Sequence, residues 1–485
     1  MEQRARIPPG LPRANPTVSY WQDPPSTLKP NGPPTPFPKS TDIIIVGSGI
    51  TGACIAFNLL QRRPGAKVVM LEARRASSPS SKARMEFASS TGGHTKGGSY
   101  RSFPANVSAL GEAEAVKIAR LEYDSMKGVH AFARQYGIEC DSFLCDTVDV
   151  FFDDEQLEEA RGAVAQMRAS PLGSDESGIC AYTFYDAEQA RTKFLTPAAR
   201  GAVVYEAGSI SAYAFVIGVL RKAMEMGLEI HEETPALGIR PLVSAEGIGW
   251  LVETPRGKIG TESLILATNG YTPHLYPELR GFIVPMRGQV TAQRPGAGLP
   301  QSGLEMTYSF IYADGYDYMI SRPAGSRFEG DIVIGGGLTK ADDANGLYEY
   351  GETDDEVLNP AVSTYLHQSL PAFFGANWGD DHPHGRVRKE WTGIMGYTPD
   401  GYPLVDHVPG SDGLYIAAAF QGHGMVLCFL CARALAQIVL AEDSVDLGDR
   451  PLDDWFPQAF RARMGRFDQE FQGKQLVARP GELNS

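Results

Sequence analysis

Cysteine is scarce in this sequence of 485 residues. The six cysteines lie at positions 54, 140, 145, 180, 428 and 431. So few cysteines in a chain of this length do not form a disulfide framework, which indicates a protein of a reducing compartment. Cys428 and Cys431 have the spacing of a redox motif, but they lie inside the apolar run from Met425 to Leu440. We therefore expect them to be buried in a helix and to have no redox role.

Long apolar runs and an excess of positive charge are also missing. No segment reaches the roughly 18 uninterrupted apolar residues of a membrane span. The first residues contain no apolar signal core, and the last ones match no sorting tag. The formal net charge is -14, which argues against a nucleic acid or an anionic membrane as partner. We therefore expect a cytoplasmic protein whose partner is a small molecule.

Metal-ligand patterns are absent from the sequence as well. His382 and His384 are two residues apart, but no third ligand with useful spacing lies near them. We expect a solvated loop there and no metal site.

The most informative motif lies near the start of the chain. An unbroken β-branched run, residues 43–46, precedes Gly-Ser-Gly-Ile-Thr-Gly, so that Gly47, Gly49 and Gly52 occupy the G-x-G-x-x-G positions between a strand and a helix. Gly47 permits the tight turn, Gly49 admits a pyrophosphate and Gly52 lets helix and strand pack closely. Glu72 ends the next strand, where an acidic side chain accepts ribose hydroxyls and disfavours a 2′-phosphate. The motif predicts a dinucleotide site, and not one for NADP.

A second glycine-rich turn follows an apolar strand near the other end of the chain. Residues 413–425 read as a strand, the turn Gly422-His423-Gly424 and the start of an apolar helix. The helix amides could stabilise negative charge on a bound ring, whereas the alternative is a plain strand-to-helix turn. A nucleotide site completed from both ends of the sequence favours a tightly held flavin over an exchangeable nicotinamide.

The order of the expected elements indicates the fold. Helices are expected at 111–136 and 212–227, and alternating residues in 281–340 predict antiparallel strands. Together they predict an α/β fold, with a discontinuous FAD/NAD(P)-binding Rossmann-like domain and an inserted antiparallel-sheet α+β substrate domain. Residues 1–40 are rich in proline and should form an extended arm docked through Tyr20 and Trp21. The expected division is the arm at 1–40, the nucleotide domain at 41–145, 195–280 and 386–445, the substrate domain at 146–194 and 281–385, and a tail at 446–485.

Six further segments follow the opening glycine motif, at 267–270, 285–289, 315–318, 322–323, 391–401 and 422–425. In this order they resemble one family, the FAD-dependent amine and amino-acid oxidoreductases of the D-amino-acid oxidase and sarcosine oxidase (DAO) type. The resemblance covers about 42–440, and the sequence looks most similar to fungal relatives of the glycine/D-amino-acid oxidase and γ-glutamylputrescine oxidase type.

The resemblance implies FAD, with its flavin ring between the two domains. The residues that it implies as FAD contacts are Gly47, Ser48, Gly49, Ile50, Thr51, Gly52, Glu72, Ala73, Thr91, Gly92, Gly93, His94, Ala267, Thr268, Asn269, Gly393, Met395, Gly422, His423, Gly424 and Met425.

The sequence departs from the family at three positions. Met395 aligns with the cysteine that carries the flavin covalently in sarcosine oxidases, which excludes a cysteinyl link. Val426 and Val333 align with lysines that pair with the substrate carboxylate and promote reaction with oxygen. In the dimethylglycine dehydrogenase branch of the family, a histidine that aligns one residue away from His94 bonds the flavin. A covalent link at His94 therefore stays open beside the non-covalent contact that we expect.

The resemblance implies oxidation of a C–N bond of an amine or amino acid by hydride transfer to flavin N5, followed by hydrolysis of the imine, with oxygen or another acceptor taking the electrons. Arg287 and Arg322 are candidates for binding a substrate carboxylate, and a structural salt bridge is the alternative for each. Tyr271, Tyr316 and Tyr318 are expected at the pocket wall or in sheet packing. A non-catalytic FAD-binding scaffold or trafficking factor and a flavin monooxygenase are the alternative functions.

Overall fold

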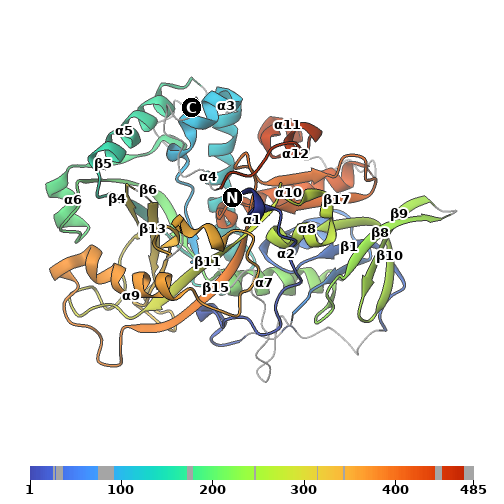
Figure 1. Cartoon of the computed structure of the whole chain (residues 1–485), viewed down its shortest axis with the longest axis horizontal. Coiled ribbons are helices and arrows are strands. Elements are labelled where there is room, and N and C mark those ends of the chain that lie inside the picture. Colours follow the sequence, from blue (N-terminus) through green and yellow to red (C-terminus); the bar gives the residue numbers. More distant parts are fainter. Residues whose placement is uncertain are drawn as a thin grey trace.

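Two large sheets organise the chain. The computed structural model describes residues 1–25, 28, 36–74, 92–171, 178–244, 247–313, 315–341, 344–442 and 450–473. One sheet lies on the right and the other on the left of Figure 1, with helices packed against both. The predicted α/β fold, a Rossmann-like sheet combined with a mainly antiparallel one, is confirmed.

The sheet on the right is the Rossmann-like one. Its strands are β1 (Ser40–Val46), β2 (Val68–Leu71), β7 (Glu229–His231), β8 (Gly238–Ser244), β9 (Gly247–Thr254), β10 (Gly257–Leu266), β16 (Leu404–His407) and β17 (Leu414–Ala418). Along the order β16-β17-β10-β1-β2-β7, all neighbours from β17 onward are parallel, as in nucleotide-binding sheets. Ile44 and Ile45 of β1 are fully buried, which is why this strand reads as a continuous apolar run.

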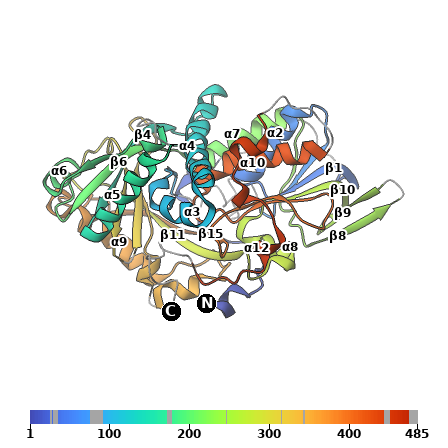
Figure 2. The ribbon, with the colours of Figure 1, turned by 90° about the horizontal axis from the view of Figure 1, so that it is seen from above.

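The helices α2 (Ile50–Arg62), α7 (Ala212–Glu225) and α10 (Gly424–Glu442) share one hydrophobic core with this sheet. Figure 2 shows α10 between α2 and α4 (Glu112–Gln135). Within the described residues, α10 is the only helix with the length and composition to cross a membrane, yet 67% of that stretch is buried inside the protein. Cys428 and Cys431 are buried in it as free thiols, so the expected core helix is confirmed.

The sheet on the left is mainly antiparallel. Its strands are β3 (His94–Thr95), β4 (Phe143–Phe151), β5 (Thr183–Tyr185), β6 (Gly201–Ser209), β11 (Val284–Gln293), β12 (Thr307–Tyr312), β13 (Gly315–Ser321), β14 (Ile332–Gly335) and β15 (Val387–Tyr397). Its order is β15-β11-β14-β13-β12-β4-β6-β3, and only β12 and β4 pair in parallel along it. The other helices are α1 (Glu2–Ala5), α3 (Phe103–Leu110), α5 (Asp154–Ala169), α6 (Ala187–Lys193), α8 (Thr272–Leu275), α9 (Pro360–Phe374), α11 (Leu452–Trp455) and α12 (Met464–Phe467).

Three strands of this sheet lie entirely in segments that the sequence assigned to the nucleotide domain. Strand β3 lies within 41–145, β6 within 195–280 and β15 within 386–445, yet β3 pairs with β6, β6 with β4 and β15 with β11 in the second sheet. The expected helices at 111–136 and 212–227 are present as α4 and α7, and β12 lies inside the predicted antiparallel segment 281–340, whereas β8 was not expected. The boundaries of the domains stay a prediction.

The described part of the N-terminal arm is docked. Tyr20 and Trp21 are 3% and 5% exposed, and Tyr20 stacks on Trp391 at 6.2 Å between ring centroids. The arm is not extended throughout, because Glu2–Ala5 form the short helix α1. This helix precedes the first proline, so no proline ring opposes it.

Candidate functional site

A cavity of about 470 Å³ lies between the two sheets. The segments that line it are 49–51, 92–94, 96–98, 286–290, 336–339, 393–395 and 422–426, with single residues between them. Because residues 49–51 and 267 follow β1 and β10, the cavity lies outside the carboxyl ends of parallel strands. Open α/β sheets bind their ligands there.

The opening glycine turn requires glycine at two positions. Gly47 has φ +105°, and a Cβ on it would lie 2.6 Å from the Ala267 carbonyl oxygen. A Cβ on Gly52 would lie 2.0 Å from the Gly47 carbonyl oxygen. Any side chain would therefore force the turn away from β10 or from α2. The turn brings Gly49, Ile50 and Thr51 to the cavity wall.

Glu72 holds this turn in place. Its Oε2 accepts hydrogen bonds from the Ser48 backbone N–H at 3.1 Å and the Ser48 hydroxyl at 2.6 Å. Its Oε1 accepts from the Arg74 backbone N–H at 2.9 Å. The carboxylate is buried but does not line the cavity, so the ribose contact predicted for Glu72 stays a prediction.

The late glycine turn meets the end of β10. Asn269 accepts a hydrogen bond at its Oδ1 from the Ala419 N–H at 2.9 Å. Asn269, Ala419 and Gln421 all have positive φ although none is glycine, a strained conformation typical of ligand sites. Gly422 follows with φ +77°, and a Cβ there would lie 2.9 Å from the Tyr397 hydroxyl. The two ends of the sequence thus form one wall.

These residues fit FAD. The N-termini of α2 and α10 both reach the cavity, and helix N-termini bind phosphates and other anionic groups. The predicted contacts that line the cavity are Gly49, Ile50, Thr51, Gly92, Gly93, His94, Ala267, Asn269, Gly393, Met395, Gly422, His423, Gly424 and Met425. Those that do not are Gly47, Ser48, Gly52, Glu72, Ala73 and Thr268. Thr91 lies outside the described residues.

His94 is held by two threonines. Its Nε2 lies 2.7 Å from Thr307 Oγ1 and 3.4 Å from Thr147 Oγ1. Burial, together with the nearby charge of Lys96, holds its pKa well below the usual value, so the ring is neutral. Since Nε2 already has partners, the contacts favour a polar role for His94 over a covalent link.

A buried charged cluster beside His94 was not predicted from the sequence. Lys96 lines the cavity, pairs with Asp149 and donates to Ser309 Oγ at 2.6 Å. Asp149 is fully buried and also accepts from the hydroxyls of Tyr100 at 2.7 Å and Tyr205 at 3.0 Å. Burial lowers the pKa of Lys96, although Asp149 opposes this shift. The sequence signal that could have identified Lys96 is its place inside a glycine-rich segment, next to predicted cofactor contacts.

Arg101 is a second cation in the cavity that was not predicted. Its guanidinium lies over the ring of Tyr316, 4.7 Å from the centroid. Within the described residues this guanidinium forms no ion pair and donates no hydrogen bond. An arginine without a carboxylate partner in a cavity is suited to bind the carboxylate of a ligand in a bidentate manner.

Glu122 of α4 contributes a carboxyl group to the same cavity. It accepts a hydrogen bond from Ser99 Oγ and lies 3.7 Å from Nδ1 of His423. Burial raises its pKa to about 7, and the Ser99 contact opposes this shift. No lysine or arginine of the described residues neutralises it. The sequence signal that could have identified Glu122 is its spacing: it lies on the same buried face of α4 as Ile118 and Met126.

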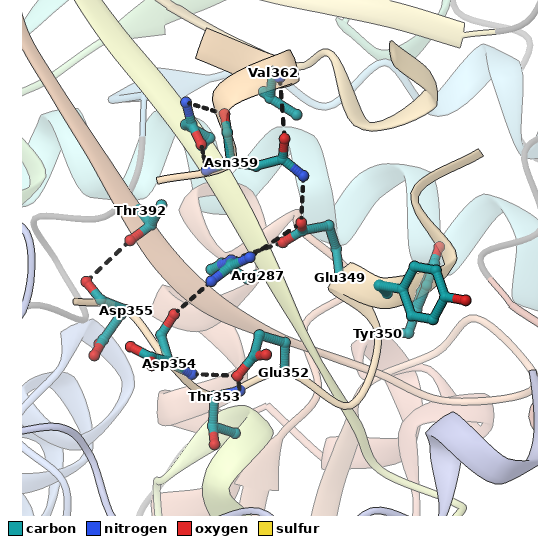
Figure 3. A network of polar contacts seen from close by, with 12 residues as sticks. Arg287, Glu349, Tyr350, Glu352, Thr353, Asp354, Asp355, Asn359, Val362 and Thr392 are labelled. Atoms are coloured by element: carbon teal, nitrogen blue, oxygen red, sulfur yellow. Dashed lines mark hydrogen bonds and ion pairs between the residues drawn. The ribbon is translucent and has the colours of Figure 1, made fainter. Parts of the chain in front are cut away.

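Arg287 lines the cavity but is already paired. Its Nε donates to Glu349 Oε2 at 2.7 Å, its Nη2 to Glu349 Oε1 at 3.1 Å and its Nη1 to the Asp354 carbonyl at 3.0 Å. Glu349 also accepts from Asn359 Nδ2 at 2.8 Å. Figure 3 shows Arg287 enclosed by these groups. A guanidinium neutralised in this way is a poor anchor for a substrate carboxylate.

Arg322 and Tyr271 do not line the cavity. Arg322 is buried, pairs with Asp141 at 2.6 Å and lies over the ring of Trp21. The structural salt bridge, the alternative expected for Arg322, is therefore the role that the structure supports. Tyr271 is buried with its hydroxyl 3.5 Å from Asp355. Tyr316 and Tyr318 do line the cavity, and their contact with a substrate stays a prediction.

Comparison with known proteins agrees with this geometry. Residues 42–438 match the model of the family described as FAD dependent oxidoreductase (DAO). The chain is 22% identical to the probable oxidoreductase OrdL of Rhizobium meliloti over 87% of its own length and 89% of that protein. It is 26% identical to the sarcosine oxidase subunit beta of the same organism, over 55% and 58%.

Two solved structures show the same fold. The glycine oxidase from Geobacillus kaustophilus has a TM-score of 0.62 at 20% identity and covers 84% of this chain and 99% of its own. The L-amino acid deaminase from Proteus myxofaciens, in complex with anthranilate, has a TM-score of 0.63 at 16% identity and covers 91% and 96%. The fungal subgroup indicated by the sequence stays a prediction.

Proposed function

Because the chain belongs to the DAO family of FAD-dependent oxidoreductases, we propose that it oxidises a C–N bond of an amino acid and releases an imine that water hydrolyses. The observation that carries this proposal is the cavity itself, in which residues that fit FAD lie together with Arg101 and Glu122. Within the described residues, Arg101 forms no ion pair, and no lysine or arginine neutralises Glu122. An amino acid has one anionic and one cationic group, and these two side chains offer a partner for each.

The residues of the chain supply binding and proton transfer in this proposal. FAD, when bound, supplies the acceptor for a hydride from the substrate carbon. Arg101 binds the substrate carboxylate, and Tyr316 fixes the plane of its guanidinium. Glu122, with a pKa of about 7, accepts the proton that an ammonium group must lose before its carbon can be oxidised. Tyr316, Tyr318 and Tyr397, which line the cavity, keep water away from the reacting carbon.

The lysines that pair with the substrate carboxylate and promote reaction with oxygen in the relatives are replaced here by valines. Val333 is fully buried in β14 and Val426 lines the cavity, so neither supplies the lysine of the relatives. Oxygen or another acceptor, and a cytoplasmic location, are our expectations.

The test is the reduction of bound FAD without oxygen. We expect the purified protein to be yellow and its flavin absorbance to bleach with at least some members of a panel of amino acids. Anthranilate, the ligand in the structure from Proteus myxofaciens, should shift the flavin spectrum without bleaching it, because its amino group is attached to a ring carbon that carries no hydrogen.

Three results would contradict the proposal. Protein that takes up no FAD would overturn the cofactor. Protein with bound FAD that no amine or amino acid bleaches would favour the non-catalytic scaffold. Bleaching by NADPH alone would favour a flavin monooxygenase.

A further inference from the structure

We propose that residues 4–21 of the N-terminal arm are a positioning element of the FAD cavity, because they hold three of its lining segments in place. These segments lie far apart in the sequence, at 92–94, 393–395 and 349, and converge only at the cavity. The match to the family model begins at residue 42, so the arm lies outside the matched part. The inference rests on FAD as cofactor and not on the amino-acid reaction.

The first contact is made by Trp21 at Gly93. Gly93 has φ +74°, and a Cβ on it would lie 2.9 Å from Cζ2 of Trp21 and 2.5 Å from the Ile210 carbonyl oxygen. The indole is thus packed directly against a residue of the cavity wall. It is itself fixed by Arg322, whose guanidinium lies 5.0 Å from the ring centroid and pairs with Asp141. Arg322 therefore acts on the cavity through Trp21 and not through substrate.

The second contact is made by Thr17 at the start of the 393–395 segment. The Thr392 backbone N–H donates to Thr17 Oγ1 at 2.9 Å, and the two threonine hydroxyls lie 3.0 Å apart. The backbone N–H of Thr17 donates to the Asp355 carbonyl at 2.8 Å. A backbone N–H of β15, an edge strand of its sheet, is thus bound by a side chain of the arm, immediately before Gly393 at the cavity.

The third contact is made by Arg4 on both sides of Glu349. Its Nε donates to the Tyr350 carbonyl at 2.7 Å and its Nη2 to the Tyr348 carbonyl at 2.5 Å. A Cβ on Gly351 would lie 2.3 Å from the Arg4 carbonyl oxygen, so the backbone of the arm is in close contact with the backbone at Gly351. Figure 3 shows Tyr350 next to Glu349, the residue that pairs with Arg287 in the cavity wall.

Two arm substitutions separate positioning from general stability. Thr17→Val removes one hydroxyl at nearly constant volume, and Thr17→Ser keeps it. Trp21→Ala removes the indole at Gly93, and Trp378→Ala is a matched control. Trp378 is 3% exposed, like Trp21 at 5%, but packs beside α9 and does not line the cavity.

The readouts are the dissociation constant of FAD, from fluorescence quenching on titration into apoprotein, the visible circular dichroism of the bound flavin, and the melting temperature of the apoprotein. We expect Trp21→Ala to weaken FAD binding by about tenfold or more and to change the flavin spectrum. Thr17→Val should weaken FAD binding less, and Thr17→Ser should restore the wild-type constant. Trp378→Ala should lower the melting temperature with an unchanged FAD constant and spectrum.

Wild-type FAD constants and spectra in both Trp21→Ala and Thr17→Val would overturn the inference, and so would an equal loss in Trp378→Ala. If Trp21→Ala does not fold, the pair at Thr17 decides alone. Failure of the wild type to bind FAD would instead refute the cofactor, and wild type that binds FAD but oxidises nothing would refute only the proposed reaction.

Discussion

The two ends of the cavity are built differently. At the Rossmann-like sheet the wall consists mainly of backbone, in turns where a Cβ on Gly47 or Gly52 would collide with carbonyl oxygens. At the antiparallel sheet the wall consists of partly buried charged side chains, of which Lys96 and Arg287 form ion pairs, whereas Arg101 forms none within the described residues.

This difference determines how each end responds to change. A backbone wall tolerates no added atom, because the colliding groups are fixed by the sheet. A wall of charges depends on pairing and on pH, because an unpaired buried charge costs free energy and can be removed by protonation or deprotonation. Substitutions at the first end should abolish binding of FAD, whereas those at the second should change stability or substrate preference gradually.

Gly52→Ala should have the largest effect. A methyl group 2.0 Å from the Gly47 carbonyl oxygen cannot be accommodated without moving the turn, so we expect FAD affinity to fall by about a thousandfold or more, at least about 4 kcal/mol. Flavin absorbance of the purified protein measures this. Gly162→Ala in α5, where a Cβ meets nothing within 4 Å, is the control and should be neutral or slightly stabilising. Full FAD content in Gly52→Ala would refute the backbone wall.

Asp149→Asn should have the next largest effect. It leaves Lys96, whose side chain is only 11% exposed, without its carboxylate, and breaking a buried pair costs about 3–5 kcal/mol. Denaturant unfolding of the apoprotein measures this loss. Asp381→Asn breaks an exposed pair with Arg386 and should cost less than about 1 kcal/mol. Equal losses in both variants would show that the Lys96 pair is not buried in solution.

Glu122→Gln should change the pH dependence of stability. Burial raises the pKa of Glu122 from 4.5 to about 7, so ionising it costs free energy in the folded state. Glu122 therefore does not reduce the free energy of unfolding below about pH 4.5, where it is protonated in both states. Between pH 4.5 and pH 7 it lowers the free energy of unfolding progressively as the pH rises. Between pH 5 and pH 8 the variant should gain roughly 2–3 kcal/mol relative to the wild type. Glu114→Gln on the same helix, beside Lys117, is the matched control, and a flat difference for Glu122→Gln would contradict the raised pKa.

The backbone end could be predicted from the sequence because its signals are local. Residues 43–52 contain the strand, the turn and the helix start in one stretch, and each glycine has a steric reason at a fixed spacing. The late turn at 422–425 could be predicted for the same reason. The late turn is joined to the end of β10 by the hydrogen bond from the Ala419 N–H to Asn269, which lies 150 residues away. This contact has no signal in the sequence.

The charged end could not be predicted because it depends on partners far apart in the chain. Arg287 and Arg322 were expected at a substrate carboxylate, but their partners Glu349 and Asp141 lie 62 and 181 residues away. Arg101 was overlooked although it is the one of the three without a carboxylate partner among the described residues. The sequence shows which residues carry charge, whereas only the fold shows which charges are neutralised.

The most direct test of the central claim compares an amino acid with the amine that lacks its carboxylate, in wild type, Arg101→Met and Arg287→Met. The flavin absorbance is followed without oxygen over a range of substrate concentrations. We predict that Arg101→Met weakens reduction by the amino acid by about 100-fold, about 2.7 kcal/mol, and leaves reduction by the amine nearly unchanged. Arg287→Met should change reduction by both substrates to the same degree, because it leaves Glu349 without its ion-pair partner. Wild-type preference for the amino acid in Arg101→Met would contradict the claim that this arginine holds the substrate carboxylate.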